Sequence, residues 1–420
     1  MKNVPISSCF LVILFAAACL SDVSVALGEK AVVPKFERQE IDKIQIGYGV
    51  AIGDVDGDKK PDILLADKKD FAWYKNPAGQ EGSKGAGSWK KHIMVTNLTQ
   101  RDNVCIDARD INGDGKVEVA VGAMWNPGET TSDKLSGSVH YLIRPKDPTA
   151  KWTPVKLHNE PTIHRMRWVQ VANEKHQLVV LPLHGRGNKG GAGAGVNVLA
   201  YDVPEDPNDA KAVWKTSVVD NTMHMTHNMD VFEKKGPDGV FAYSMILVAG
   251  KQGGGGFMPS PKGWQKLPKP KAFSQGSGEI RVSQKRTDAG YGYVATIEPM
   301  HGNNVVVYAG KQGEPGPKRT VLDSTLKHGH ALGIADVLGI GRPQVIAGWR
   351  FPNSDKKVGV KIYVPRDDSF EKFDTYLIDD NKMACEDLKL ADLNGDGKLD
   401  IITAGRGTKN LVIYWNRTGE

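Results

Sequence analysis

The chain has 420 residues, with 55 Lys and Arg against 49 Asp and Glu, which leaves a formal net charge of +6. Its 40% hydrophobic, 25% charged and 7% aromatic residues lie near globular averages and exclude a wholly disordered chain or a polytopic membrane protein. The 47 Gly and 23 Pro residues favour many turns between short strands. The basic residues are spread along the chain, so nucleic acid is not an expected partner.

Residues 1–26 are predicted to be a signal peptide. Lys2 supplies a positive charge, the apolar run Cys9–Ala18 is too short to span a bilayer, and Ser24-Val25-Ala26 has the small residues of a cleavage site. We therefore expect an exported protein, periplasmic or extracellular. Processing as a lipoprotein at Cys19, after three alanines, is the alternative. No later stretch is apolar enough to span a membrane. The remaining cysteines, Cys105 and Cys385, are expected to be buried free thiols.

Three segments of the chain repeat one pattern of strand, acidic loop and strand. They run from Val50 to Ala66, from Asp110 to Gly122 and from Asp392 to Ala404. Four weaker copies keep the apolar strands and lose most of the acids. We align the seven units on the position of the first acid in the loop and call this position the register mark. The marks are Asp54, Asp110, Gln170, Glu233, Lys285, Asp336 and Asp392. Seven units of roughly 55 residues therefore fill residues 33–420, which we interpret as a single domain.

Each unit contains further strand signals. A third strand ends in Tyr in six of the seven units, for example at Tyr74 and Tyr141, and a fourth strand leads into the next unit. Four short strands repeated seven times predict an all-β, seven-bladed β-propeller of four-stranded blades. The segment Lys35–Ile41 resembles a fourth strand but precedes the first unit. It is expected to complete blade 7 and close the ring.

The acidic loops resemble FG-GAP, or VCBS-type, repeats, which form calcium-loop blades in propellers. In this pattern alternate residues supply oxygen ligands, glycine permits the turn, and a later carboxylate closes the shell, which suits Ca²⁺. About three structural calcium ions are expected, because the ligands are largely lost in the other units. The predicted ligands are Asp54, Asp56, Asp58, Asp62, Asp110, Asn112, Asp114, Glu118, Asp392, Asn394, Asp396 and Asp400. Solvated hairpin turns without an ion are the alternative.

Residues that begin the innermost strands should meet around the propeller axis, on the face opposite the calcium loops. The residues six positions before each mark are Tyr48, Val104, His164, His227, Glu279, His330 and Glu386. Five of them are metal-ligand or acid–base types. Loops expected on the same face add Trp125, His184, Arg186, Lys251, His301, Trp349, Arg350 and Arg406. Imidazoles with carboxylates suit Zn²⁺ or Mn²⁺, so we expect one divalent transition metal held by His164, His227, His330, Glu279 and Glu386. A wet channel whose polar groups satisfy one another is the alternative.

Segments of this face resemble the FG-GAP propellers of secreted planctomycete proteins and, more distantly, the propeller domain of aldos-2-ulose dehydratases. They include Ile163–Trp168, Pro182–Gly187, Thr226–Met229, Ile297–Gly302, Gly329–Ala331 and Ala384–Asp387. The enzyme family also carries cupin domains, whereas residues 33–420 of this chain are expected to form the propeller alone. The resemblance implies a secreted, metal-dependent carbohydrate lyase, a carbon–oxygen lyase that carries out β-elimination or dehydration of a keto-sugar or keto-glycoside in a central pocket.

In that hypothesis His301, His184 and Tyr48 carry protons, while Arg165, Arg186 and Arg350 hold the hydroxyls or acid group of the sugar. The competing hypothesis is a non-catalytic, calcium-stabilised propeller that binds a polysaccharide or a protein partner with the same face. Nothing in the sequence indicates the oligomeric state.

Overall fold

The computed structural model describes residues 32–77, 87–284, 292–310 and 316–420. Residues 34–420 form one compact unit. The predicted signal peptide, Cys19 and the register mark Lys285 lie outside the described residues. No helix in the described ranges is long and apolar enough to cross a membrane.

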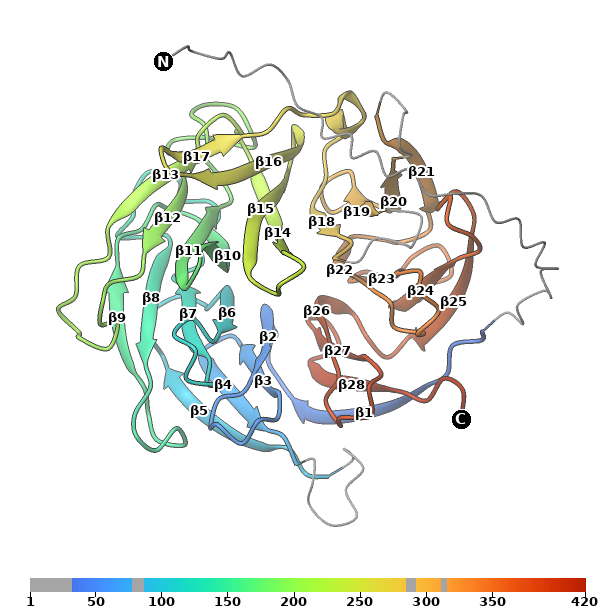
Figure 1. Ribbon diagram of the computed structural model, residues 1–420, viewed down its shortest axis with the longest axis horizontal. Coiled ribbons are helices and arrows are strands. Elements are labelled where there is room, and N and C mark those ends of the chain that lie inside the picture. The colour runs from blue at the N-terminus through green and yellow to red at the C-terminus, as the bar shows by residue number, and fades with distance from the viewer. Residues whose placement is uncertain (1–31, 78–86, 285–291, 311–315) are drawn as a thin grey trace. The chain divides into compact units, whose positions relative to one another are not determined.

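Within residues 34–420, seven antiparallel sheets of four strands surround a central axis (Figure 1). Blade 1 contains β2 (Gly49–Gly53), β3 (Asp62–Ala66), β4 (Asp70–Lys75) and β5 (Lys90–Thr96). Blade 2 contains β6 (Cys105–Arg109), β7 (Glu118–Ala123), β8 (Ser138–Ile143) and β9 (Thr153–Leu157). Blade 3 contains β10 (Ile163–Ala172), β11 (Lys175–Pro182), β12 (Val198–Asp202) and β13 (Thr216–Asp220). Blade 4 contains β14 (Thr226–Lys235), β15 (Phe241–Gly250), β16 (Gly253–Ser260) and β17 (Gly263–Lys266).

A short 3-10 helix, η1 (Lys271–Ser274), precedes blade 5. Blade 5 contains β18 (Glu279–Val282), β19 (Tyr293–Glu298), β20 (Asn304–Ala309) and β21 (Lys318–Asp323). Blade 6 contains β22 (Gly329–Ala335), β23 (Gln344–Trp349), β24 (Gly359–Pro365) and β25 (Phe373–Asp380). Blade 7 contains β26 (Cys385–Ala391), β27 (Asp400–Gly405), β28 (Asn410–Asn416) and, from the other end of the domain, β1 (Phe36–Lys43). The predicted seven-bladed propeller is confirmed.

The outer edge of blade 7 is formed by β1, which pairs antiparallel with β28 from Phe36 opposite Asn416 to Lys43 opposite Asn410. Two side chains on this strand add contacts of their own. Gln39 accepts a hydrogen bond from the indole of Trp415 at 2.8 Å, and Asp42 accepts one from the hydroxyl of Tyr74 at 2.7 Å. The first strand of the domain thereby joins its last blade to its first.

The middle strands are apolar because neighbouring blades cover both of their faces. All five residues of β3 and all seven of β28 are buried. The repeated third-strand tyrosines, such as Tyr74, Tyr201 and Tyr363, are fully buried in this core. Blade 4 lacks this tyrosine, and Phe257 of β16 is buried in its core. Cys105 and Cys385 are buried free thiols, as expected.

The inner strands are also linked by carboxylates. Asp107 accepts the backbone N–H of Trp168 at 2.7 Å, and Asp387 accepts that of Val50 at 2.8 Å. Each bond runs from the inner strand of one blade to that of the next. Because successive inner strands contact one another around the ring, residues that begin these strands are brought to one end of the axis.

Candidate functional site

Four of the predicted site residues lie at interruptions in the pairing between the first and second strands of their blades. The pairing skips His164 in blade 3, His227 in blade 4, His330 in blade 6 and Glu386 in blade 7. Glu279 of blade 5 is paired regularly with Ile297. A β-bulge bends the strand and re-aims a side chain. The bulges therefore occur at the residues that carry imidazole or carboxylate toward the axis.

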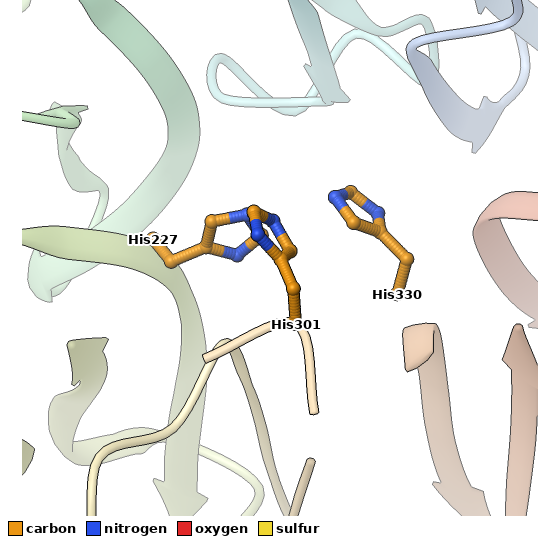
Figure 2. Close-up of side chains that lie close together, drawn as sticks. All are labelled: His227, His301 and His330. Atoms are coloured by element: carbon orange, nitrogen blue, oxygen red, sulfur yellow. The ribbon is translucent and has the colours of Figure 1, made fainter. Parts of the chain in front are cut away.

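Three imidazoles from three blades converge there. His227, His301 and His330 each offer a ring nitrogen, and these atoms lie within 4.8 Å of one another. Figure 2 shows the three rings turned toward one another from separate segments of the chain. The Nε2 atoms of His227 and His301 are 2.6 Å apart, and the rings of His227 and His330 meet edge to face at 5.0 Å between centroids. We call these three residues the histidine trio.

Backbone carbonyls determine which ring nitrogen is available. Nδ1 of His227 lies 2.7 Å from the carbonyl oxygen of Gly278, and Nδ1 of His330 lies 2.7 Å from that of Glu386. A carbonyl oxygen only accepts, so Nδ1 carries the proton in both rings. Nε2 is then left with its lone pair, the form in which a histidine binds a metal.

The structure differs from the expectation at His164. Its Nδ1 donates to the carbonyl oxygen of His227 at 2.7 Å, but its Nε2 faces Nη1 of Arg165 at 3.4 Å. A guanidinium only donates, so it engages the lone pair that a metal would need. The third ring nitrogen of the converging group belongs to His301, which the sequence suggested as a proton carrier.

The two predicted carboxylate ligands occupy different sides of the trio. Oε1 of Glu279 lies 3.4 Å from Nδ1 of His227, on the side of the ring away from Nε2, and Oε2 accepts a hydrogen bond from Asn228 at 2.6 Å. Burial raises the pKa of Glu279 to about 7. Glu279 therefore lies behind His227 and not among the nitrogens that could bind a metal. Its regular strand pairing with Ile297 distinguishes it from the four site residues that lie at bulges.

Glu386 lies on the nitrogen side. Its Oε1 is 4.0 Å from Nε2 of His330. Arg350 donates to its Oε2 at 2.8 Å, and Arg406 approaches Oε1 at 3.4 Å. Arg350 also donates to Nδ1 of His328 at 2.7 Å, and His328 stacks on His301. His328 lies two residues before His330 and was not among the residues expected at the site. It lies in a bend just before β22, so the alternation of side chains along a strand does not predict its contacts.

Two of these histidines, one in the trio and one beside it, have strained backbones. His301 has φ of 53° and His328 has φ of 61°, in the left-handed region that side chains other than glycine rarely adopt. His301 follows β19, which ends at Glu298, and this carboxylate is held by Arg319 at 2.6 Å. Backbone strain of this kind clusters at functional sites.

Arg165 and Arg350 act electrostatically on the trio and Tyr48 lies against Arg406, whereas two other predicted residues make their contacts elsewhere. Tyr48 is buried, burial raises its pKa, and the guanidinium of Arg406 lies over its ring at 5.1 Å. Arg186 contacts Glu160 at 2.9 Å and the carbonyl of Thr131 at 2.6 Å. The backbone of His184 pairs with Thr162 and Met225. These contacts of Arg186 and His184 are made within blades 2 to 4, and none involves the trio.

Burial lowers the pKa of every histidine in the centre. The pKa values of His164, His227 and His330 lie well below the usual range, and nearby Arg165 lowers each of them further. The pKa of His328 falls to about 4 through burial and then through Arg350. All these imidazoles are therefore neutral near pH 7, which keeps their lone pairs available.

The three acidic loops share one geometry at the opposite end of the inner strands. In each loop the first aspartate accepts backbone N–H groups three and five residues later, as Asp392 does from Gly395 at 2.7 Å and Gly397 at 2.8 Å. The corresponding residues are Asp54 and Asp110. Asn112, Asp114, Asn394 and Asp396 accept N–H groups two residues on. Within the described loops, three carboxylates meet within 4.8 Å at Asp54, Asp56 and Asp58.

The last carboxylate of each loop is buried and bonded to backbone. The oxygens of Asp62 accept N–H groups of Val55 at 2.9 Å and Asn76 at 2.8 Å. Asp400 accepts those of Leu393 and Asn416 in the same way, and Glu118 accepts that of Ile111. Burial raises the pKa of all three carboxyls to about 7. These residues tie the loops to the blades, and each oxygen keeps a further lone pair.

The donor sets differ between the two ends of the propeller. The loop at Asp54 offers oxygen only, which fits Ca²⁺, and its excess charge is met by Lys75, which pairs with Asp56 and with Asp58 at 3.2 Å. The trio offers neutral nitrogen with one carboxylate nearby, which fits Zn²⁺ or Mn²⁺. Both sets of residues therefore fit the ions expected for them.

Comparisons with known proteins confirm the resemblance that the motifs indicated. Residues 136–311 match the family model of the aldos-2-ulose dehydratase β-propeller domain, and residues 47–121 match an FG-GAP-like repeat. Aldos-2-ulose dehydratase of Phanerodontia chrysosporium is 24% identical over 279 residues, which span 64% of this chain and 29% of that protein. The first match includes His164, His227, Glu279 and His301 and ends before His330.

Two solved structures resemble the chain at low identity. AofleA from Arthrobotrys oligospora is 8% identical with a TM-score of 0.44, over 82% of this chain and 89% of that one. YCF48 bound to D1 peptide is 11% identical with a TM-score of 0.49, over 92% and 98%.

Proposed function

We propose that this protein is a metal-dependent carbohydrate lyase that cleaves a carbon–oxygen bond of a keto-sugar or keto-glycoside at the histidine trio. The observation that carries the proposal is the convergence of His227, His301 and His330 within 4.8 Å. The similarity to the propeller domain of aldos-2-ulose dehydratase supports a carbohydrate-related role. The expected signal peptide would place the activity outside the cytoplasm.

The three histidines would hold the metal, and a divalent metal supplies a Lewis acid that polarises a sugar ketone. Glu386, 4.0 Å from Nε2 of His330, is the carboxylate placed to accept the proton from the adjacent carbon. Tyr48 stays protonated because burial raises its pKa, so it can donate a proton to the leaving oxygen. Arg350 orients Glu386 through their 2.8 Å bond. The base and the acid thus come from blades 7 and 1.

Calcium is proposed for the acidic loops, with a structural role. Two of the three loops, those of blades 1 and 7, are joined to a neighbouring blade by an asparagine at the end of a third strand. Asn76 donates to the carbonyl of Leu393 at 2.8 Å, and Asn416 donates to that of Val337 at 2.7 Å. An ion that holds the loop would therefore also stabilise the contact between blades.

A non-catalytic binding module is the second candidate. The observation that favours it is that the histidines already satisfy one another, since His301 can donate to Nε2 of His227 and the Nδ1 atoms bond to carbonyls. Such a network needs no ion. In that case the same face would bind a polysaccharide or a protein without chemistry.

The test is an elimination assay. Purified protein, stripped with chelator and reloaded with Zn²⁺ or Mn²⁺, is incubated with keto-sugars and keto-glycosides. Elimination forms a conjugated enone, followed by ultraviolet absorbance, and releases water or alcohol, followed by mass spectrometry. We expect activity only after reloading, loss in His330→Ala, and retention in the remote loop variant Asp396→Asn. If the protein shows no turnover and binds no transition metal, the lyase proposal fails and the non-catalytic binding module replaces it.

A further inference from the structure

Positive charge exceeds negative charge around the histidine trio. Arg165 and Arg350 act electrostatically on its histidines, and Arg350 and Arg406 share a single carboxylate, that of Glu386. Arg165 is only 4% exposed. Its guanidinium donates to the carbonyl of His164 at 2.9 Å, and no carboxylate among the described residues forms an ion pair with it. Arg165 instead acts electrostatically on two buried carboxylates farther along the axis, Glu279 and Asp387.

These two carboxylates each have another cation, and Nζ of Lys389 lies 3.8 Å from Oδ2 of Asp387. Glu279 lies behind His227 and has a cation of its own, since Nη2 of Arg281 is 3.5 Å from its Oε2. Together Glu279 and Arg281 contribute no net negative charge to the face. A divalent metal at the trio, which the proposed function requires, would add two further positive charges.

A buried charge without a counter-charge is costly, so this face is suited to a ligand that brings negative charge. We propose that the ligand is an acidic sugar, a uronic acid residue whose carboxylate is received by Arg406 beside Tyr48. The proposal deepens the proposed function by naming its substrate class, and it rests on that function for the location of the ligand.

Arg406 has the geometry for this role. Its side chain is 40% exposed, and its contact with Glu386 is a single one at 3.4 Å, which leaves other N–H donors toward solvent. A guanidinium fits a carboxylate with two parallel bonds. On the same face, Phe351 is 50% exposed, packs on His328 at 4.7 Å between ring centroids, and has the guanidinium of Arg350 over its ring at 5.9 Å. An aromatic face next to a cation suits a sugar ring that carries an acid.

The test compares sugars that differ only in charge. Calorimetric titrations use a panel of short uronic acid oligomers, the methyl esters of the same oligomers, and sulfated oligosaccharides. We expect at least one free acid to bind at least tenfold more tightly than its ester, with an affinity that falls as salt increases. Arg406→Gln should abolish the preference for acid over ester, and Arg406→Lys should retain part of it, with unchanged melting temperatures. Arg366→Gln, an exposed arginine on the opposite face paired with Asp374, should behave as wild type.

Equal binding of acids and esters would overturn the proposal, as would binding of sulfated sugars with no binding of any uronic acid. An unchanged preference in Arg406→Gln would also overturn it. These results are separable from the elimination assay, because binding is measured without turnover. Turnover of neutral keto-sugars with no preference for acids would overturn this inference alone, whereas acid preference without elimination would overturn the lyase proposal alone.

Discussion

The Nε2 atom of His227, on the inner strand of blade 4, lies 2.6 Å from the Nε2 atom of His301, on a loop of blade 5. Because Nδ1 of His227 donates to the carbonyl of Gly278, its Nε2 must accept in this contact, and His301 must donate. A metal ion would need His301 to present a lone pair at the same atom. The pair can therefore act as a hydrogen bond or as two ligands, depending on the tautomer of His301.

The first prediction separates the histidines that face the trio from the one that does not. His227→Ala should lose bound Zn²⁺ or Mn²⁺, because it removes one of three converging nitrogens. His164→Ala should retain the metal, because Nε2 of His164 already faces Arg165. Elemental analysis of both proteins after dialysis is the measurement. Loss of metal in His164→Ala with retention in His227→Ala would reverse the assignment.

The second prediction concerns the acidic loops. Asp58→Asn should weaken stabilisation by Ca²⁺ but change little in chelator, because the amide oxygen can still accept the N–H of Lys60. Asp62→Asn should cost about 1–3 kcal/mol in either condition, because an amide has one acceptor oxygen for the two N–H groups of Val55 and Asn76. Melting temperatures with calcium and with chelator distinguish the two. If chelator lowers neither wild type nor Asp62→Asn, the loops need no ion.

The propeller could be predicted from the sequence because the same pattern of strands and turns repeats at a regular spacing. Register marks set by Asp54, Asp110 and Asp392 place every inner strand, and the residue six positions earlier lies within one residue of the start of each of these strands. The segment that resembled a spare fourth strand pairs with β28. These relationships follow from the spacing of apolar runs and turns, which a single sequence displays.

The composition of the site could not be predicted in the same way. Whether a side chain at a strand start faces the axis depends on a bulge, which is present at His330 and absent at Glu279. The direction of the His164 lone pair depends on the rotamer of Arg165. His301 reaches the trio from a tight loop with a left-handed backbone. These three features depend on local packing between blades. They do not follow from the spacing of the repeats.

The third prediction concerns pH and His140, on β8 far from the trio. His140 is buried, neither of its ring nitrogens has a hydrogen-bond partner among the described residues, and burial followed by Lys156 lowers its pKa from 6.5 to about 4. The unfolded chain therefore binds this proton more readily. The stabilising contribution is fully present above pH 6.5 and is lost as pH falls toward 4, by about 3 kcal/mol in total.

Denaturant unfolding of wild type at several pH values between 7.5 and 4.5 measures this loss. His140→Leu should show a shallower fall in stability over this range, while His158→Leu, at an exposed position of the same blade, should follow wild type. Parallel curves for His140→Leu and wild type would show that the ring does not stay neutral because of burial.

The last prediction uses the strained backbone of His301, whose φ is 53°. Glycine adopts this conformation without strain, whereas alanine keeps the strain and loses the imidazole. His301→Gly should therefore be about 1 kcal/mol more stable than His301→Ala in denaturant unfolding, although both lack the same side-chain contacts with His227 and His328. Both variants should lose the transition metal, since each removes one ligand of the trio. If the two are equally stable, the left-handed backbone is not strained. If either retains the full metal content, His301 is no ligand, and the site is built on His227 and His330 with a partner other than His301.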